Sequence, residues 1–137
     1  MSQLAPFGPK ARRIVTRAAT VSPLIIREVI DLASGVRDLV VHPAGEVDLV
    51  TSAQFQRAVF SALDRSRRVC LDLAEVTFFD ILGLRTLNEA SRRADDDEQA
   101  FWLRNPSRIL RRVMVLSDMD RLNLDNPMTP RHDRESA

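Results

Sequence analysis

Apolar runs of strand length alternate with amphipathic stretches of helix length along the middle of this chain. Residues 68–73 ("RVCLDL") place Val69, Leu71 and Leu73 on one side, as in a strand packed mainly on one face. Residues 100–104 ("AFWLR") form a second such run, and a helical pattern separates the two. Because strands joined through a helix pair in parallel by a crossover, this alternation predicts an α/β domain.

The segment ahead of this alternation has the pattern of an antiparallel hairpin. Residues 24–33 ("LIIREVIDLA") and 39–49 ("LVVHPAGEVDL") are strand-like, and "SGVRD" between them is a turn signal. Pro43 has no amide hydrogen to donate to a ladder. We therefore expect one end of the hairpin to lie at a sheet edge or a bulge.

The clearest helix follows the hairpin. Its apolar residues recur at i, i+3, i+4, i+7 and i+8 and are Phe55, Ala58, Val59, Ala62 and Leu63. Thr51 and Gln54 have the spacing of a capping box at its start, and Val50 with Phe55 has that of a hydrophobic staple. These signals predict a helix that begins after Thr51.

Two further helices are predicted by the same period. The buried stripe of the second is Leu84, Leu87, Ala90, Ser91 and Ala94. The third has Asn105 as its expected N-cap and Pro106 at its first position, where a missing amide hydrogen costs nothing. Its expected buried stripe is Ile109, Leu110, Val113 and Leu116.

Length and charge restrict the classes of function. The 137 residues, of which 45% are hydrophobic and 28% charged, suit one globular domain. A net charge of +1 lacks the positive field of a general nucleic-acid binder, so a protein partner is favoured. No window reaches the roughly 18 apolar residues of a membrane span, and no export signal is evident, which makes a cytoplasmic location the expectation.

The two ends differ from the middle in composition. Residues 1–23 contain Lys10 and three arginines, no acidic residue and three prolines, which is typical of a basic flexible arm. Residues 126–137 ("NPMTPRHDRESA") are polar and are expected to form a tail. The predicted domain therefore extends over residues 24–125.

Three stretches in order along this domain resemble the STAS domains of bacterial anti-anti-sigma factors. They are "VHPAGEVDLVTSAQFQRAV" (41–59), "RVCLDLAEVTFFDILGL" (68–84) and "NPSRILRRVMVLSDMDRLNL" (105–124). The resemblance implies a STAS-like single domain of the α/β class. Its sheet would be mixed, with four to five strands, and its helices would pack mainly on one face.

The resemblance also implies a partner-binding surface. Gly45, Glu46 and Asp48 match the family's G-E-x-D turn, while Asp80, Gly83 and Leu84 match its D-S-S-G-L motif. Matches to the end of the family's buried strand and to the loop ahead of its third helix are Asp72, Leu73, Asn105 and Pro106. The implied partner-binding residues are Glu46, Asp48, Asp80, Ile81, Leu82, Gly83 and Leu84.

In such proteins a kinase-type anti-sigma factor phosphorylates the second serine of D-S-S-G-L, and the added charge releases the partner. Leu82 occupies this position here, and neither Leu82 nor Ile81 has a hydroxyl group. The usual switch is therefore chemically closed at both positions. Thr77 and Thr86 are the nearby hydroxyls, and neither is a like-for-like substitute.

Several residues also have a purely structural interpretation. Asp80 can act as a helix N-cap, as a partner contact, or as both. Ile81 and Leu82 either pack under the loop or form an exposed apolar pair that reinforces docking. Cys70 has the pattern of an inert core residue and not of a redox sensor.

No metal, cofactor or catalytic residue is predicted. The acidic run "DDDE" at 95–98 lacks the spaced ligands of a calcium loop, and His42 and His132 have no ligand cluster around them. There is no Gly-rich phosphate loop and no nucleophile with an evident base, so an enzyme is not expected.

The sequence thus predicts a cytoplasmic binding module that captures a kinase-type anti-sigma factor and so frees a sigma factor. Two alternatives stay open, namely the STAS subunit of a bacterial lipid-transport ATP-driven complex and a component of a larger STAS signalling assembly. A homodimer also stays open, and neither the partner nor a replacement for the phosphorylation switch can be named from the residues.

Overall fold

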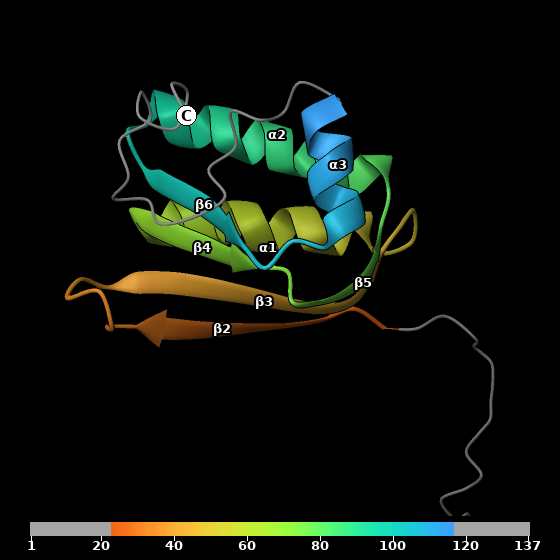
Figure 1. Ribbon diagram of the computed structural model, residues 1–137. Helices are drawn as coiled ribbons and strands as arrows, with labels where there is room; N and C mark the ends of the chain where they lie inside the picture. The colour runs from red at the N-terminus through yellow and green to blue at the C-terminus, as the bar shows by residue number, and fades with distance from the viewer. Residues whose placement is uncertain (1–22, 117–137) are drawn as a thin grey trace, which may run out of the picture.

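The computed structural model of the chain describes residues 23–116 (Figure 1). Its elements are, in chain order, β2 (Ile25–Asp31), β3 (Asp38–Val47), α1 (Ser52–Arg65), β4 (Arg68–Asp72), β5 (Glu75–Phe79), α2 (Ile81–Asp96), β6 (Ala100–Arg104) and α3 (Arg108–Leu116). The predicted arm, apart from Pro23, and the predicted tail lie outside the described residues.

The five strands form one mixed sheet. Its order is β2-β3-β4-β6, and β5 pairs with β3. The opening hairpin β2–β3 is antiparallel, whereas the β3–β4, β3–β5 and β4–β6 pairs are parallel, as crossover connections require. The predicted α/β class and mixed sheet are therefore confirmed, but the strand β5 was not predicted.

The long strand β3 lies inside the sheet and divides one of its sides between two partners. Leu39 to Val41 pair with β4, and Ala44 to Val47 pair with β5. Pro43 falls between the two ladders, where neither β4 nor β5 pairs with β3, and β2 of the hairpin is an edge strand of the sheet. The expected bulge is present, because the β5 register shifts between Gly45 and Glu46, where Gly45 has a φ of +126°.

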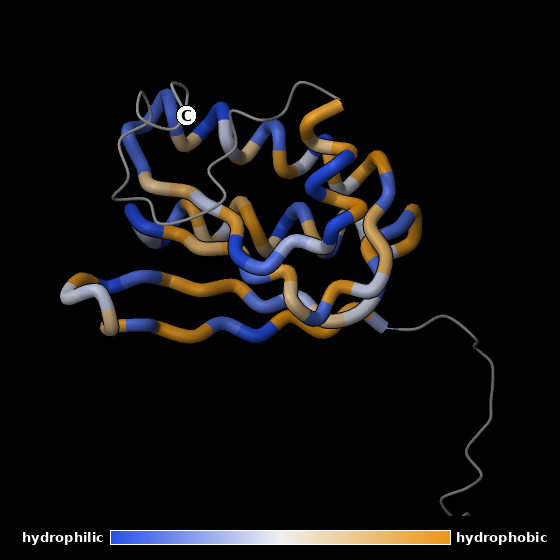
Figure 2. Tube along the Cα trace, viewed as in Figure 1, coloured by the Kyte–Doolittle hydropathy of each residue, from blue (hydrophilic) through white to orange (hydrophobic). Residues whose placement is uncertain are grey.

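All three helices pack on one face of the sheet (Figure 1). Their apolar stripes meet the inward residues of the strands in one core, whose largest fully buried members include Phe55, Leu71, Leu87, Leu103 and Met114. Hydrophobic and hydrophilic residues alternate along the helices in Figure 2, as burial of one helix face requires. The predicted stripes of α1 and α2 are confirmed, since their expected core residues are buried apart from the half-buried Ala58.

The opposite face of the sheet carries a second, smaller cluster. Val40, Cys70 and Trp102 lie side by side on β3, β4 and β6 and are buried. The guanidinium of Arg68 stacks 5.4 Å from the centre of the Trp102 ring, and its Nε donates to Asp38 at 2.5 Å. Strand 68–73 is therefore buried on both faces, and the prediction that it packs mainly on one side is wrong.

The capping box predicted at the start of α1 does not form. The Thr51 hydroxyl donates to the carbonyl oxygen of Glu46 at 2.6 Å, and Gln54 Nε2 donates to the carbonyl oxygen of Leu24 at 2.8 Å. Val50 is exposed, so the staple is absent as well. Both polar side chains instead bond to backbone carbonyl groups outside the helix, one in β3 and one just before β2.

The start of α3 also differs from the prediction. Its cap is Ser107, whose Oγ accepts the amide hydrogen of Leu110 at 3.0 Å. Asn105 has a φ of +58° and turns the chain before the helix, a conformation that asparagine tolerates. Of the expected stripe, Leu110 is buried with Met114, but Ile109 and Leu116 are exposed.

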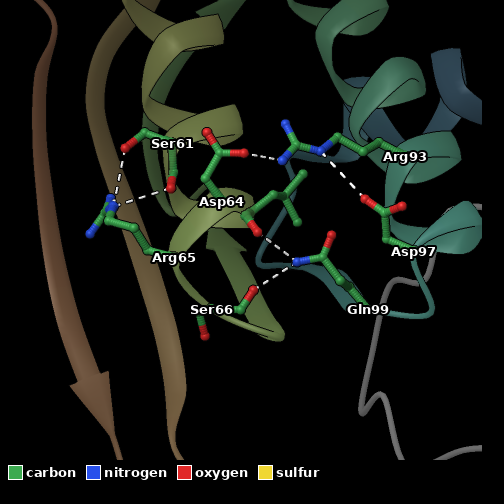
Figure 3. A network of polar contacts seen from close by, with 8 residues as sticks. Ser61, Asp64, Arg65, Ser66, Arg93, Asp97 and Gln99 are labelled. Carbon is green, nitrogen blue, oxygen red and sulfur yellow. Dashed lines mark hydrogen bonds and ion pairs between the residues drawn. The ribbon is translucent and has the colours of Figure 1, made fainter.

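Polar contacts join the C-terminal ends of α1 and α2 (Figure 3). Arg93 bonds to Asp64 and lies 3.9 Å from Asp97, while Gln99 Nε2 donates to the carbonyl oxygens of Leu63 and Ser66 at 2.6 and 2.8 Å. The acidic run 95–98 is thus the turn that ends α2. Among residues 23–116 no group of three or more His, Cys, Asp or Glu side chains could hold a metal ion.

No helix among the described residues is both long enough and apolar enough to cross a bilayer.

Cys70 should be chemically silent in the native protein. Burial raises the pKa of its thiol to about 12, so the reactive thiolate is scarce at neutral and mildly alkaline pH. We expect a thiol reagent to label Cys70 only after denaturant is added, and Cys70→Ala to leave partner binding unchanged in reducing and oxidising buffer. Rapid labelling of the native protein would show that this face of the sheet is open.

Candidate partner-binding site

The parallel pairing of β3 with β5 brings together the two groups of residues that the resemblance implies, one after each strand. Strands β3 and β5 end side by side, with Val47 opposite Phe79, and the amide of Asp80 donates to the carbonyl oxygen of Val47 at 3.0 Å. The loops that follow the two strands therefore leave the sheet at the same edge. Asp48 lies in the first loop and Asp80 in the second.

Asp48 organises the turn before α1. Its Oδ1 accepts the amide hydrogens of Val50 and Thr51 at 3.0 and 3.1 Å. Its own carbonyl oxygen accepts the amide hydrogen of Ser52 at 2.8 Å. An aspartate in this geometry satisfies amides that a helix start leaves unpaired. Asp48 thus fixes the turn that leads into α1, while no side chain of the described residues caps the first turn of the helix itself.

Asp80 is the N-cap of α2. Its Oδ1 accepts the amide hydrogens of Leu82 and Gly83 at 2.9 and 3.3 Å, and its φ and ψ of −101° and −171° are those of a cap residue. The capping role is therefore present. Both of these hydrogen bonds use Oδ1 of Asp80. Within residues 23–116, Oδ2 accepts none, so this oxygen is available to a partner.

The two aliphatic residues after Asp80 differ in exposure. Ile81 is 65% exposed and Leu82 is half-buried. Gly83 and Leu84 are buried, so they lie beneath the surface that Ile81 and Leu82 form. Of the seven implied residues, the side chains that reach the surface are Glu46, Asp48, Asp80, Ile81 and Leu82.

Gly83 is required by the close approach of a ring. A Cβ at this position would lie 2.7 Å from Cζ of Phe79. Phe79 packs edge-on against the buried ring of Phe55, with centroids 5.4 Å apart, so it has little freedom to withdraw. The absence of a side chain at Gly83 therefore allows the start of α2 to pack closely against Phe79 of β5.

The two nearby threonines are not equivalent. Thr86 is 4% exposed within α2, where a kinase could reach it only if the helix moved. Thr77 is exposed on β5, and its hydroxyl donates to the carbonyl oxygen of Gly45 at 3.3 Å. Thr77 is thus the accessible hydroxyl of the pair.

Asp72 anchors the loop ahead of α3. It accepts hydrogen bonds from Arg104 Nε at 3.1 Å, Asn105 Nδ2 at 3.2 Å and the Ala74 amide at 3.0 Å. Burial acts to raise the pKa of the carboxyl, but these hydrogen bonds outweigh it and the pKa is lowered. His42 Nδ1 lies 3.8 Å from the same carboxylate.

A pocket of about 320 Å³ opens beside the start of α2. Its lining residues include Val76, Phe78 and Phe79 of β5, Leu84 of α2, and Leu110 and Val113 of α3. The sequence analysis does not predict this pocket, because it does not predict the strand β5 that forms one of its walls. The run "VTFF", rich in β-branched and aromatic residues, is the signal that could have indicated a strand.

Solved structures share this fold, and several of them are structures of anti-sigma factor antagonists. An anti-sigma factor antagonist from Mycobacterium paratuberculosis is 25% identical, with a TM-score of 0.57 over 70% of this chain and 80% of that chain. A putative anti-sigma factor antagonist from Thermotoga maritima is 20% identical, with a TM-score of 0.58 over 65% and 80%. The phosphorylated Bacillus cell fate determinant SpoIIAA is 19% identical, with a TM-score of 0.56 over 79% and 98%.

The family model described as "Mlab, STAS domain" matches residues 30–126, and the chain belongs to this family. A comparison with curated proteins gives no match. The predicted membership of the STAS family is therefore confirmed.

Gly83→Ala should destabilise the protein. The added methyl group must displace Phe79 or the first turn of α2, and overpacking of this kind costs roughly 1–3 kcal/mol. Urea unfolding monitored by circular dichroism measures the change in the free energy of unfolding. Gly83→Ala combined with Phe79→Leu should recover part of the loss, and a single variant as stable as the wild type would show that the ring moves aside freely.

Asp72→Asn should make the free energy of unfolding less dependent on pH in the acidic range. A carboxyl whose folded pKa lies below its unfolded pKa stabilises the fold above the unfolded value, and this contribution is lost as pH falls through the folded pKa. At pH 7 the variant should lose roughly 1–3 kcal/mol, because a charged acceptor of several hydrogen bonds is replaced. Urea titrations should show that the difference in the free energy of unfolding between wild type and variant becomes smaller below about pH 4, the ordinary range of an aspartate pKa. A difference that is constant with pH would mean that the charge of Asp72 is not involved.

Proposed function

We propose that this protein is a binding module that docks a partner protein on the surface formed by the loops after β3 and β5 and by the start of α2. We call this the α2 surface; its residues are Glu46, Asp48, Asp80, Ile81 and Leu82. The observation that carries the proposal is the exposure of Ile81 at a helix start that Asp80 holds rigidly. An apolar side chain on a preorganised support loses little entropy when it is covered.

The charges of the α2 surface support a protein partner. None of Glu46, Asp48 and Asp80 forms an ion pair with another described residue. Three acidic groups around an aliphatic centre have the arrangement of an interface with an apolar core and a polar rim. A partner that presents cations around an apolar contact would be complementary to it.

The proposed partner is a kinase-type anti-sigma factor, and the proposed site of action is the cytoplasm. The similar structures of anti-sigma factor antagonists support this choice. SpoIIAA is known in a phosphorylated form, but this chain has Leu82 where the resemblance implies the phosphoserine. Capture by this protein would then not be reversed by phosphate at that position.

A second candidate is the STAS subunit of a bacterial lipid-transport ATP-driven complex. The family description favours it, because it names Mlab and no anti-sigma factor antagonist. Membership of a larger STAS signalling assembly is the third candidate. All three are binding functions and need no catalytic residue.

Co-purification of the tagged full chain with its native partners separates these candidates. Recovery of a histidine-kinase-like ATPase domain supports the sigma pathway, and recovery of a transport ATPase supports the lipid-transport complex. Replacement of Ile81 by Asp is the matched variant, since a partner bound at the α2 surface should then be lost. A partner that is retained by the variant binds elsewhere.

Substitutions of Leu82 should weaken binding in a fixed order. Leu82→Ala removes an apolar contact worth up to about 2 kcal/mol, and Leu82→Glu also places a charge beside Asp80 in a surface that loses water on docking. The expected order of affinity for the purified partner is wild type, Ala, then Glu, as measured by titration calorimetry. With a kinase-type partner and ATP, residue 82 should stay unmodified and the complex should persist.

Leu32→Glu is a suitable control because Leu32 is 62% exposed in the turn of the β2–β3 hairpin, at the other end of the molecule (Figure 1). Circular dichroism should show that all variants fold. Equal affinities for the three forms of residue 82 would exclude the α2 surface as the docking surface. ATP-dependent phosphate at Thr77 would instead show that the switch has moved.

A further inference from the structure

The outward side of α3 carries apolar residues that the fold leaves uncovered. Ile109 is 76% exposed and Leu116 is 80% exposed, and Val113 between them is half-buried. Their spacing of i, i+4 and i+7 places them in one stripe. This stripe is separate from Leu110 and Met114, which bury the inner side of the same helix.

A concave site adjoins this stripe. Ile109 and Val113 line the pocket between α3 and β5, and Phe78, which is 51% exposed, lines it from the other side. The pocket holds about 320 Å³, which is room for one large side chain and not for a folded segment. Exposed apolar groups around a small pocket are the usual arrangement of an anchor site in a protein interface.

Three arginines belong to the same helix, α3. Arg108, Arg111 and Arg112 are exposed, and none of them forms an ion pair within residues 23–116. The arginines that do form ion pairs there are Arg27, Arg65, Arg68, Arg93 and Arg104. The surface of α3 therefore carries exposed cations that no described carboxylate pairs with, which makes it complementary to an acidic ligand.

We propose that α3 and the adjoining pocket form a second docking surface, which binds an amphipathic helix whose apolar anchors are flanked by acidic residues. We call it the α3 surface. One apolar side chain of the ligand helix would fill the pocket between Ile109 and Phe78, and another, one turn along, would cover Val113 and Leu116. Glutamates beside these anchors would meet the arginines.

The α3 surface is continuous with the α2 surface but has the opposite charge. Phe79 and Leu84 line the pocket, and they also support the start of α2 from below. A partner that covers both surfaces must place its cations near Asp80 and its acidic helix near α3. Opposite charges at the two ends set one orientation of the partner, which is what electrostatic complementarity chiefly provides.

A second copy of this chain fits less well than a separate partner. The acidic run 95–98 lies at the C-terminal end of α2, whereas the pocket adjoins the N-terminal end of that helix. A symmetric dimer would therefore have to bring the far end of α2 of each copy onto α3 of the other, and Asp97 in that run already lies 3.9 Å from Arg93 of its own chain.

The test uses the full chain and synthetic helical peptides. One peptide carries leucines at i, i+4 and i+7 flanked by glutamates, and its matched control has lysines in place of the glutamates. Fluorescence anisotropy should show binding of the glutamate peptide, with the lysine peptide at least about tenfold weaker at low ionic strength. Equal binding of both peptides overturns the proposal.

Two variants and two controls locate the site. Ile109→Asp, and Arg108→Glu with Arg112→Glu, should each weaken binding of the glutamate peptide by about tenfold or more. Leu32→Asp and Arg57→Glu change similar exposed side chains on other elements and should bind as the wild type does. Because every changed residue is exposed, circular dichroism should show native folding; loss of binding in the controls, or unchanged binding in the variants, overturns the assignment.

Two outcomes would assign the surface to a different occupant and so overturn the proposal. The first is a dimer in sedimentation equilibrium that dissociates on Ile109→Asp, which would identify a second copy. The second is peptide binding that begins only when residues 117–137 are deleted, which would identify the chain's own C-terminal segment. Since the test requires no native partner, its failure leaves the function proposed for the α2 surface intact.

Discussion

The division of β3 between two parallel partners is the constraint on which the molecule depends. The first half of the strand pairs with β4 and carries the core, while the second half pairs with β5 and carries the site. Pro43 lies at the change of partner, and the register of the second ladder shifts between Gly45 and Glu46, where β5 has the extra residue Thr77. Without the second ladder, Asp48 and Asp80 would belong to unconnected loops.

Asp48 and Asp80 are both held in place by hydrogen bonds to the backbone. Asp48 and Asp80 each commit one carboxylate oxygen to backbone amides at the start of a helix. A charge held in this way is ordered before a partner arrives, so docking does not have to immobilise it. The observed capping role of Asp80 is therefore compatible with the proposed contact role.

The chain combines the scaffold of a switchable module with residues that cannot take the usual switch. Leu82 and Ile81 supply apolar area where the resemblance implies hydroxyl groups, and Thr86 is buried. Apolar contacts respond weakly to pH and salt, whereas a phosphate adds about two negative charges. Phosphorylation at residue 82 is therefore not available for release of the proposed partner.

Local signals in the sequence determined the elements whose stability is itself local. The stripe of α2, its Asp80 cap and the hairpin were predicted because each depends on residues within a few positions of one another. Tertiary structure decided the rest. The Thr51 hydroxyl and Gln54 bond to distant backbone carbonyls, β5 forms only because β3 offers it an edge, and the exposure of Ile109 depends on which side of α3 the sheet covers. Periodicity shows that a helix has an apolar stripe, but it cannot show whether a neighbour in the fold or a partner outside it will bury that stripe.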